Sequence, residues 1–258
     1  MLTFQHKENQ DRRLEGMVLR AKIRKNQLGI GQRAAEVICV IDISGSMYKH
    51  FQSGRVQEIV ERMLAIGLNF DPDKQIQIIA FGMRAHDCGT INQNNYHECV
   101  QQNDDGTVTI NGNRLQLESG TRYAPAIDKA YGMAFGKDWK TLNVQRRFLR
   151  PDTTPTLNEP IANPFFTIFV TDGECSDGNK AQELVKHGSG LPLFTQFAGF
   201  GQSNFNTLDA IDNMRGRVVD NAGVFTADSL NITDEQLLDG MLNEFPDWLN
   251  KTANRGWY

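Results

Sequence analysis

The chain has 258 residues, of which 40% are hydrophobic and 22% are charged, so it can bury a full core as one large domain or two small ones. The net charge of −4 argues against a general nucleic-acid binder. No apolar run approaches the ~20 residues that a membrane-spanning helix needs, and residues 1–8 lack the apolar core of a secretion signal. We therefore expect one decorated domain in the cytoplasm, with no transmembrane segment.

Charge is unevenly spread along the chain. Residues 1–35 hold eight Lys or Arg and three acidic residues, a net charge of +5, which leaves −9 for the rest. We treat residues 1–30 as a basic N-terminal segment and residues 31–258 as the main domain. The charge leaves two interpretations open. The segment contacts an acidic partner or the acidic body of its own domain, or it is a solvated arm, which is the simplest interpretation.

Strand and helix patterns alternate along the main domain. The β-branched run at 36–41 predicts a strand that is buried on both faces, and the apolar stripe over 54–70 predicts a helix. Alternation of this kind predicts an α/β fold with a doubly wound, mostly parallel central sheet and helices on both faces. The remaining expected elements are strand 75–81, helix 94–101, helix 125–135, strand 165–170, helix 179–187, strand 193–200, helix 205–214, an extended run 217–225 and a last helix that starts with a capping box at Thr233 and ends at Pro246.

Two segments interrupt the alternation. Residues 107–117 hold short extended runs around Asn111-Gly112, which predicts an inserted hairpin that ends just before Thr121. Residues 137–164 form a long irregular loop, and loops of that length in a compact domain are usually functional or mobile. Either insertion sets the choice of partner or is a tolerated surface feature.

Oxygen-bearing side chains follow the predicted strands at three places. A carboxylate and two hydroxyls come directly after the first strand, a hydroxyl lies in the loop before helix 125–135, and a carboxylate follows strand 165–170. Ligands in open sheets bind at the carboxyl ends of strands, where these groups would meet. Hard oxygen ligands suit Mg²⁺, Mn²⁺ or Ca²⁺. The candidate metal ligands are Asp42, Ser44, Ser46, Thr121 and Asp172.

Two further chemical interpretations remain open. A metal-assisted hydrolase would use the same Mg²⁺ site, with His50 as a base, although the second aspartate of a phosphatase-type motif is replaced by Ser44. The two His-x-Cys pairs could supply a second metal site, but their spacing departs from common zinc motifs. These pairs are His86 with Cys88 and His97 with Cys99.

The order Asp-x-Ser-x-Ser, Gly-Thr and Thr-Asp-Gly resembles the metal-ion-dependent adhesion site of von Willebrand factor A (vWA) domains. The chain is also similar to the vWA domain of tellurium-resistance, TerF-like bacterial stress proteins, and more distantly to copines, over roughly residues 24–250. This second resemblance rests on Gly54-Arg55-Val56-Gln57, Glu61-Arg62, Asn95-Tyr96, Gly120-Thr121-Arg122-Tyr123-Ala124-Pro125, Gln196-Phe197-Ala198-Gly199-Phe200-Gly201, Arg217-Val218-Val219-Asp220-Asn221 and Leu242-Asn243-Glu244-Phe245-Pro246-Asp247-Trp248-Leu249.

The resemblance implies a function. Ser44 and Ser46 would bind the ion through their hydroxyls, Asp42 and Asp172 directly or through water, and Thr121 in one conformation of a mobile loop. If either carboxylate reaches the ion only through water, the direct ligands are mostly neutral hydroxyls, so the ion stays electrophilic and accepts an acidic side chain from a protein partner. We therefore expect an ion-dependent protein-binding module rather than an enzyme. The sequence does not indicate the oligomeric state.

Three residues beside these ligands are candidates for partner contact. Arg122 and Tyr123 follow Thr121, and Glu174 lies close behind Asp172. Glu174 could also strengthen the field at the ion. Asp177, nearby, is expected to cap the helix that follows it.

Overall fold

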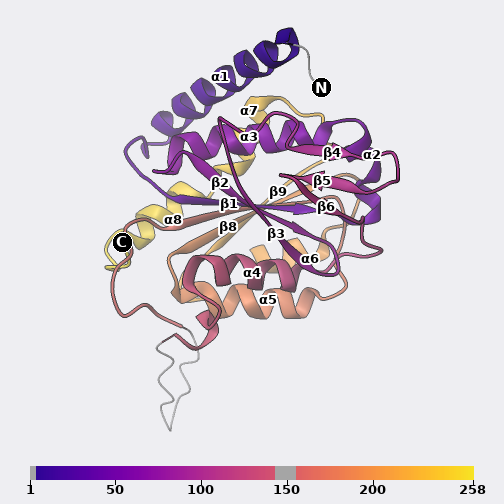
Figure 1. The fold of residues 1–258 in the computed structure, drawn as a ribbon. Coiled ribbons are helices and arrows are strands. Elements are labelled where there is room, and N and C mark those ends of the chain that lie inside the picture. Colours follow the sequence, from indigo (N-terminus) through magenta and orange to yellow (C-terminus); the bar gives the residue numbers. More distant parts are fainter. Residues whose placement is uncertain (1–3, 143–154) are drawn as a thin grey trace.

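The computed structural model describes residues 4–142 and 155–258. A six-stranded sheet lies at its centre, in the order β3-β2-β1-β7-β8-β9 (Figure 1). All neighbours in it run parallel except the edge strand β3, which is antiparallel to β2. The strands are β1 (Glu36–Asp42), β2 (Gln75–Phe81), β3 (Ala85–Asn92), β7 (Phe165–Thr171), β8 (Leu193–Phe200) and β9 (Ala222–Ala227).

Helices cover both faces of this sheet, so the predicted doubly wound α/β fold is confirmed (Figure 1). One layer packs on the core that contains Cys39, Ile41 and Phe166, and the other on the core that contains Val40 and Phe169. Alternate residues of β1 and β7 thus point to opposite layers, as expected for strands buried on both faces. The first layer holds α1 (Phe4–Gln27), α3 (Arg55–Phe70), α7 (Asp234–Met241) and α8 (Phe245–Thr252), and the second holds α4 (Tyr123–Phe135), α5 (Gly178–His187) and α6 (Asn206–Asp212).

A second, three-stranded sheet lies beside the main one. It consists of β4 (Val100–Gln102), β5 (Val108–Ile110) and β6 (Asn113–Leu115), and β5 and β6 form the expected hairpin across Asn111-Gly112. The short helix expected over residues 94–101 is wrong. Glu98 has a φ of 50°, which interrupts a right-handed helix, and Val100 pairs with Ile110.

Pro246 does not end the last helix as expected. The capping box at Thr233 opens α7, which stops at Met241, and Pro246 then lies in the first turn of the separate helix α8. The first helical turn tolerates proline because its N–H would have no intrahelical partner there. Strand β9 also begins later than expected, at Ala222.

The long loop at 137–164 is described only at its two ends. A single 3₁₀ turn, Trp139–Thr141, follows α4, and residues 143–154 lie outside the described part of the chain. Within residues 4–142 and 155–258, no helix has both the length and the apolar character needed to cross a bilayer.

The basic N-terminal segment forms α1, which packs against α3 (Figure 1), so the expectation of a solvated arm is wrong. Leu14, Met17 and Ala21 are buried in the core that includes α3. Charge complementarity adds to this packing, because Arg20 lies 3.2 Å from Asp234 of α7. The segment therefore contacts the acidic body of its own domain, which was one of the two alternatives.

The only cation paired with Glu61 of α3, within the described residues, comes from α1. Arg13 forms an ion pair with Glu61, whose side chain is completely buried. The amides of Gln10 and Gln57 also donate to this carboxylate, at 3.1 and 3.0 Å. Burial of an ionised carboxylate is costly unless it is paired and hydrogen-bonded, so α1 offsets a charge that the main domain buries.

We expect Arg13→Ala to destabilise the protein by about 1–2 kcal/mol, because it leaves the buried Glu61 without a cation while the two glutamine bonds remain. Arg12→Ala is the matched control: Arg12 is an exposed neighbour on α1 with no ion pair to the described residues, and its loss should cost less than about 0.5 kcal/mol. Urea unfolding of the three proteins measures both values. Equal stability of the two variants would contradict the role assigned to Arg13.

Candidate metal centre

The parallel pairing of β1 with β7 brings the two candidate carboxylates together. Ile41 of β1 is level with Val170 of β7, so Asp42 ends β1 beside Thr171, and Asp172 follows directly. The chain leaves β1 towards β2 on one side, whereas β7 continues to β8 on the other. The pair therefore lies at the switch point of the sheet, where open α/β sheets bind ligands.

A chain of hydrogen bonds joins four of the five predicted ligands. Asp42 Oδ1 accepts from the backbone N–H of Ser44 (2.7 Å), which holds the loop after β1 in a tight turn. The hydroxyls of Ser44 and Ser46 are 3.0 Å apart, and Ser46 Oγ donates to Asp172 Oδ1 (2.7 Å). Thr171 Oγ1 donates to the other oxygen of Asp42 (2.6 Å). Sequence reasoning quoted Thr171 as part of a motif but did not assign it this contact.

Burial sets the electrostatics of this cluster. Asp42 is completely buried, which raises the pKa of its carboxyl to about 6 although Thr171 and Ser44 donate hydrogen bonds to it. Burial also raises the pKa of Asp172, against the hydrogen bond from Ser46. Neither carboxylate forms an ion pair with a basic side chain of the described residues. Two carboxylates and two hydroxyls without a cation are a donor set that fits a hard divalent ion.

Access to the cluster differs between its two halves. Asp42 and Ser44 are buried, whereas Ser46 is exposed and Asp172 is partly exposed. An ion held by these four residues would therefore have its protein ligands on the inner side and solvent, or another protein, on the outer side.

Thr121 lies in a loop that is fastened to the site through the backbone. The carbonyl of Thr121 accepts from the N–H of Ser176 (3.0 Å) and from its hydroxyl (3.2 Å), beyond the end of β7. The same loop meets the turn after β1, where Glu118 O accepts from Gly45 N (2.8 Å). Among the described residues, the Thr121 hydroxyl makes no hydrogen bond to the other four predicted ligands.

The three residues considered for partner contact have different surroundings. Tyr123 is completely buried and its hydroxyl donates to the Gly173 carbonyl, so a partner cannot reach its side chain in this conformation. Glu174 accepts from the N–H of Thr207 (3.0 Å), in the first turn of α6. Partial burial would raise the pKa of its carboxyl, but hydrogen bonds such as this one lower it overall. Arg122, whose side chain is 37% exposed, and Glu174, which is also exposed, are therefore the two of these residues that a partner can reach in this conformation.

Asp177 has a role that sequence reasoning missed. It was expected to cap α5, but its side chain makes no capping bond to that helix. Its oxygens instead accept from the N–H groups of Tyr123 (2.8 Å) and Ala124 (3.2 Å), the first residues of α4. A carboxylate at a helix N-terminus accepts hydrogen bonds from free N–H groups and interacts favourably with the positive end of the helix dipole. Nothing in the sequence indicated a partner more than 50 residues away.

The two His-x-Cys pairs do not converge. His86 Nε2 lies 2.8 Å from a carboxylate oxygen of Glu118, and His97 Nε2 lies 2.9 Å from one of Asp11. Cys88 and Cys99 are buried, and burial raises the pKa of both thiols. These pairs therefore contribute to packing and to separate polar contacts.

One other acidic cluster has ligand atoms close enough for an ion, within the part of the chain that is described. It contains Glu36, Asp71 and Asp73, whose oxygens lie within 4.8 Å of one another. Asp71 already accepts from the N–H groups of Val37 (3.1 Å) and Asp73 (2.9 Å). The cluster lies where β1 begins, at the opposite end of this strand from Asp42.

The chain is similar to several known proteins. The chain is 28% identical over 223 residues to "Uncharacterized protein YcbR" of Bacillus subtilis (strain 168), which covers 86% of this chain and 80% of that one. Among solved structures it is similar to proximal thread matrix protein 1 from the mussel byssus (TM-score 0.48, 14% identity, 81% of this chain and 47% of that chain). Another structure of that mussel protein, with a zinc-occupied MIDAS motif, has a TM-score of 0.44 at 15% identity and covers 84% of this chain and 48% of that one.

A third solved structure in these comparisons is the ArnB paralog VWA2 from Sulfolobus acidocaldarius (TM-score 0.44, 14% identity, 80% of this chain and 45% of that chain). The chain spans about half the length of these solved structures.

The match to a protein family covers the whole of both sheets. A family model described as "vWA-TerF-like: vWA found in TerF C terminus" matches residues 34–258, which include every strand and leave out α1. The expected resemblance is thereby confirmed, and the chain belongs to the vWA-TerF-like family.

Proposed function

We propose that this protein is a divalent-cation-dependent protein-binding module. Asp42, Ser44, Ser46, Thr121 and Asp172 would hold the ion, and a partner protein would supply an acidic side chain to it. The observation that supports this most is the hydrogen-bonded chain from the buried Asp42 to the partly exposed Asp172, which has two carboxylates and no ion pair to a basic side chain among the described residues, although His50 lies close enough to lower the pKa of Asp172. Mg²⁺ is the expected ion, with Mn²⁺ or Ca²⁺ as alternatives, because all side-chain donors are oxygens.

The hydrogen bonds favour different modes of contact with the ion for the different ligands. Both oxygens of Asp42 accept hydrogen bonds from groups that hold the turn and β7 in place, which favours contact through water. The two serine hydroxyls and Asp172 are bonded only to one another, apart from backbone contacts, and can turn their lone pairs to an ion. A bound divalent ion supplies the positive charge that attracts a partner's carboxylate.

We further propose that the module binds without catalysis and works in the cytoplasm, in a stress or tellurium-resistance role of the TerF type. All four cysteines have free thiols, as is usual in a reducing compartment. His50, the one base considered for hydrolysis, has no hydrogen bond from its ring to Asp172 or the serines in the described structure. Metal-dependent turnover of any member of a broad phosphoester panel would contradict the non-enzymatic assignment.

Ser46→Ala should weaken Mg²⁺ binding on the order of tenfold or more, because it removes an exposed hydroxyl ligand together with its hydrogen bonds to Ser44 and Asp172. Isothermal titration calorimetry measures the affinity, and the rise in Tm with Mg²⁺ gives an independent value. The matched control is Ser53→Ala, another exposed serine shortly after the same loop, whose hydroxyl contacts only the His50 carbonyl (3.3 Å). Equal Mg²⁺ affinity of the two variants would rule out this site.

Partner capture should require both the ion and its ligands. We expect a protein from native lysate to bind wild type in Mg²⁺, and to be lost in EDTA and in Ser46→Ala and Asp42→Ala, because each change removes the cation that attracts the partner's carboxylate. Circular dichroism checks that every sample is folded, and Ser53→Ala should retain the partner. If the same proteins bound to every sample, including wild type in EDTA and the two ligand variants, partner binding would not use the ion.

A further inference from the structure

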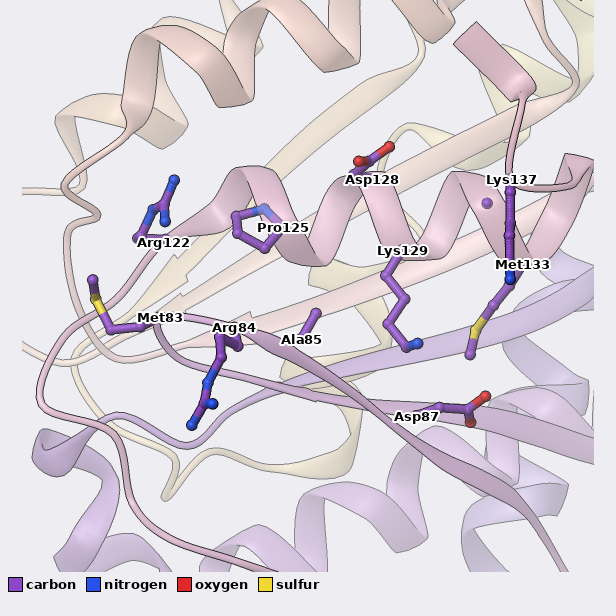
Figure 2. A pocket seen from close by; sticks show the side chains of 11 residues that line it. Met83, Arg84, Ala85, Asp87, Arg122, Pro125, Asp128, Lys129, Met133 and Lys137 are labelled. Atoms are coloured by element: carbon purple, nitrogen blue, oxygen red, sulfur yellow. The ribbon is translucent and has the colours of Figure 1, made fainter.

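An open groove runs along α4 beside the candidate metal centre. It has a volume of about 730 Å³ and lies between the edge strand β3 and α4 (Figure 2). Met83 and Arg122 lie at one end and Lys137 and Met133 at the other, while the side chain of Lys129 extends from α4 towards β3 between them (Figure 2).

Four basic side chains line this groove: Arg84, Arg122, Lys129 and Lys137. Lys129 and Lys137 form no ion pair with any described residue. Arg84 is 79% exposed and only approaches Glu118, at 3.6 Å. Arg122 is 3.4 Å from Asp177, whose oxygens also cap α4.

The two acidic residues of the groove are already engaged. Asp128 accepts from Trp139 Nε1 (2.8 Å) and pairs with Lys140 (2.7 Å), outside the groove lining. Asp87 Oδ1 accepts from the side chain of Gln77 (2.8 Å) and from the N–H of Gly89 (2.9 Å). Asp87 keeps its charge because both of these donors are neutral, but the lining holds four basic side chains against two acidic ones, so the groove is a local cationic surface on a chain whose net charge is −4.

One end of the groove adjoins Thr121, one of the five predicted metal ligands. Arg122 follows Thr121, and its N–H donates to the Gly82 carbonyl at 2.9 Å. Met83, which is 39% exposed, packs against Gly120. A Cβ atom added at Gly120 would lie only 2.9 Å from the Met83 sulfur. From this end the 13 residues of α4 extend for about 20 Å, which an extended peptide covers in about six or seven residues.

We propose that this groove binds an extended acidic segment of the partner protein. In an extended polyproline II conformation, which repeats every three residues, its first carboxylate would lie on the metal ion, and later ones, three and six residues further on along the same face, would reach Lys129 and Lys137. This inference rests on the proposed function, and adds to it that the partner presents a run of spaced acidic residues. Unpaired lysines in a partly enclosed groove favour such a segment because complementary charge increases both association and selectivity.

The test uses the full chain and labelled synthetic peptides, with binding measured by fluorescence anisotropy in Mg²⁺. One peptide has glutamates at its first, fourth and seventh positions in a Gly/Ser background, and a second keeps only the first glutamate. The groove variant combines Lys129→Gln with Lys137→Gln. Its control combines Lys22→Gln with Lys251→Gln, which removes the same charge from exposed lysines of α1 and α8, in the opposite helix layer.

Wild type and the control should bind the three-glutamate peptide about five- to twentyfold more tightly than the one-glutamate peptide. The groove variant should lose this advantage and keep its Mg²⁺ affinity. An advantage that persists in the groove variant, or is absent from wild type, would overturn the proposal. So would tighter binding of single-stranded oligothymidylate than of the peptide, if the same lysines were required.

EDTA and Ser46→Ala separate the two hypotheses. If they abolish peptide binding while the groove variant leaves it unchanged, the metal function holds and the groove is wrong. If the groove variant abolishes the advantage while EDTA and Ser46→Ala leave it unchanged, the groove is supported and the metal function fails.

Discussion

The parallel register between β1 and β7 is the constraint on which the candidate metal centre depends. Each strand ends in an oxygen-bearing loop, and the sheet holds these loops side by side although Ser46 and Asp172 are 126 residues apart in the chain. Both strands are buried on both faces, so a shift by one residue would move every side chain into the wrong helix layer. The two hydrophobic cores therefore fix the site as firmly as the hydrogen bonds within it do.

The loop after β7 connects that site to the second helix layer. Glu174 accepts from the first turn of α6, Asp177 accepts from the first turn of α4, and Ser176 donates to the Thr121 carbonyl. Carboxylates at helix N-termini serve both hydrogen bonding and the helix dipole. The residues just after Asp172 thus hold both the Thr121 backbone and the start of α4, which borders the cationic groove.

In the opposite helix layer, the basic N-terminal helix forms ion pairs with acidic residues of the main domain. The basic α1 precedes the region matched to the family, and it places Arg13 on the buried Glu61 and Arg24 2.8 Å from Asp239 of α7. The acidic body thus neutralises the basic segment within one molecule. Helix α4, which borders the cationic groove, covers the other face of the sheet from α1, α3 and α7 (Figure 1).

The sequence by itself determined the fold class, most strands and long helices, and the oxygen-rich loops at the ends of β1 and β7, because these depend on local periodicity and on residue type next to a strand. It misassigned residues 94–101, where the pairing of Val100 with Ile110 decides the conformation, and it could not show that Asp177 caps α4 and not α5. Only the tertiary structure decided which carboxylates hold an accessible site and which hold helices. The reason is physical: burial, ion pairing and capping across more than 50 residues depend on where segments meet in space, and local sequence patterns do not encode those meetings.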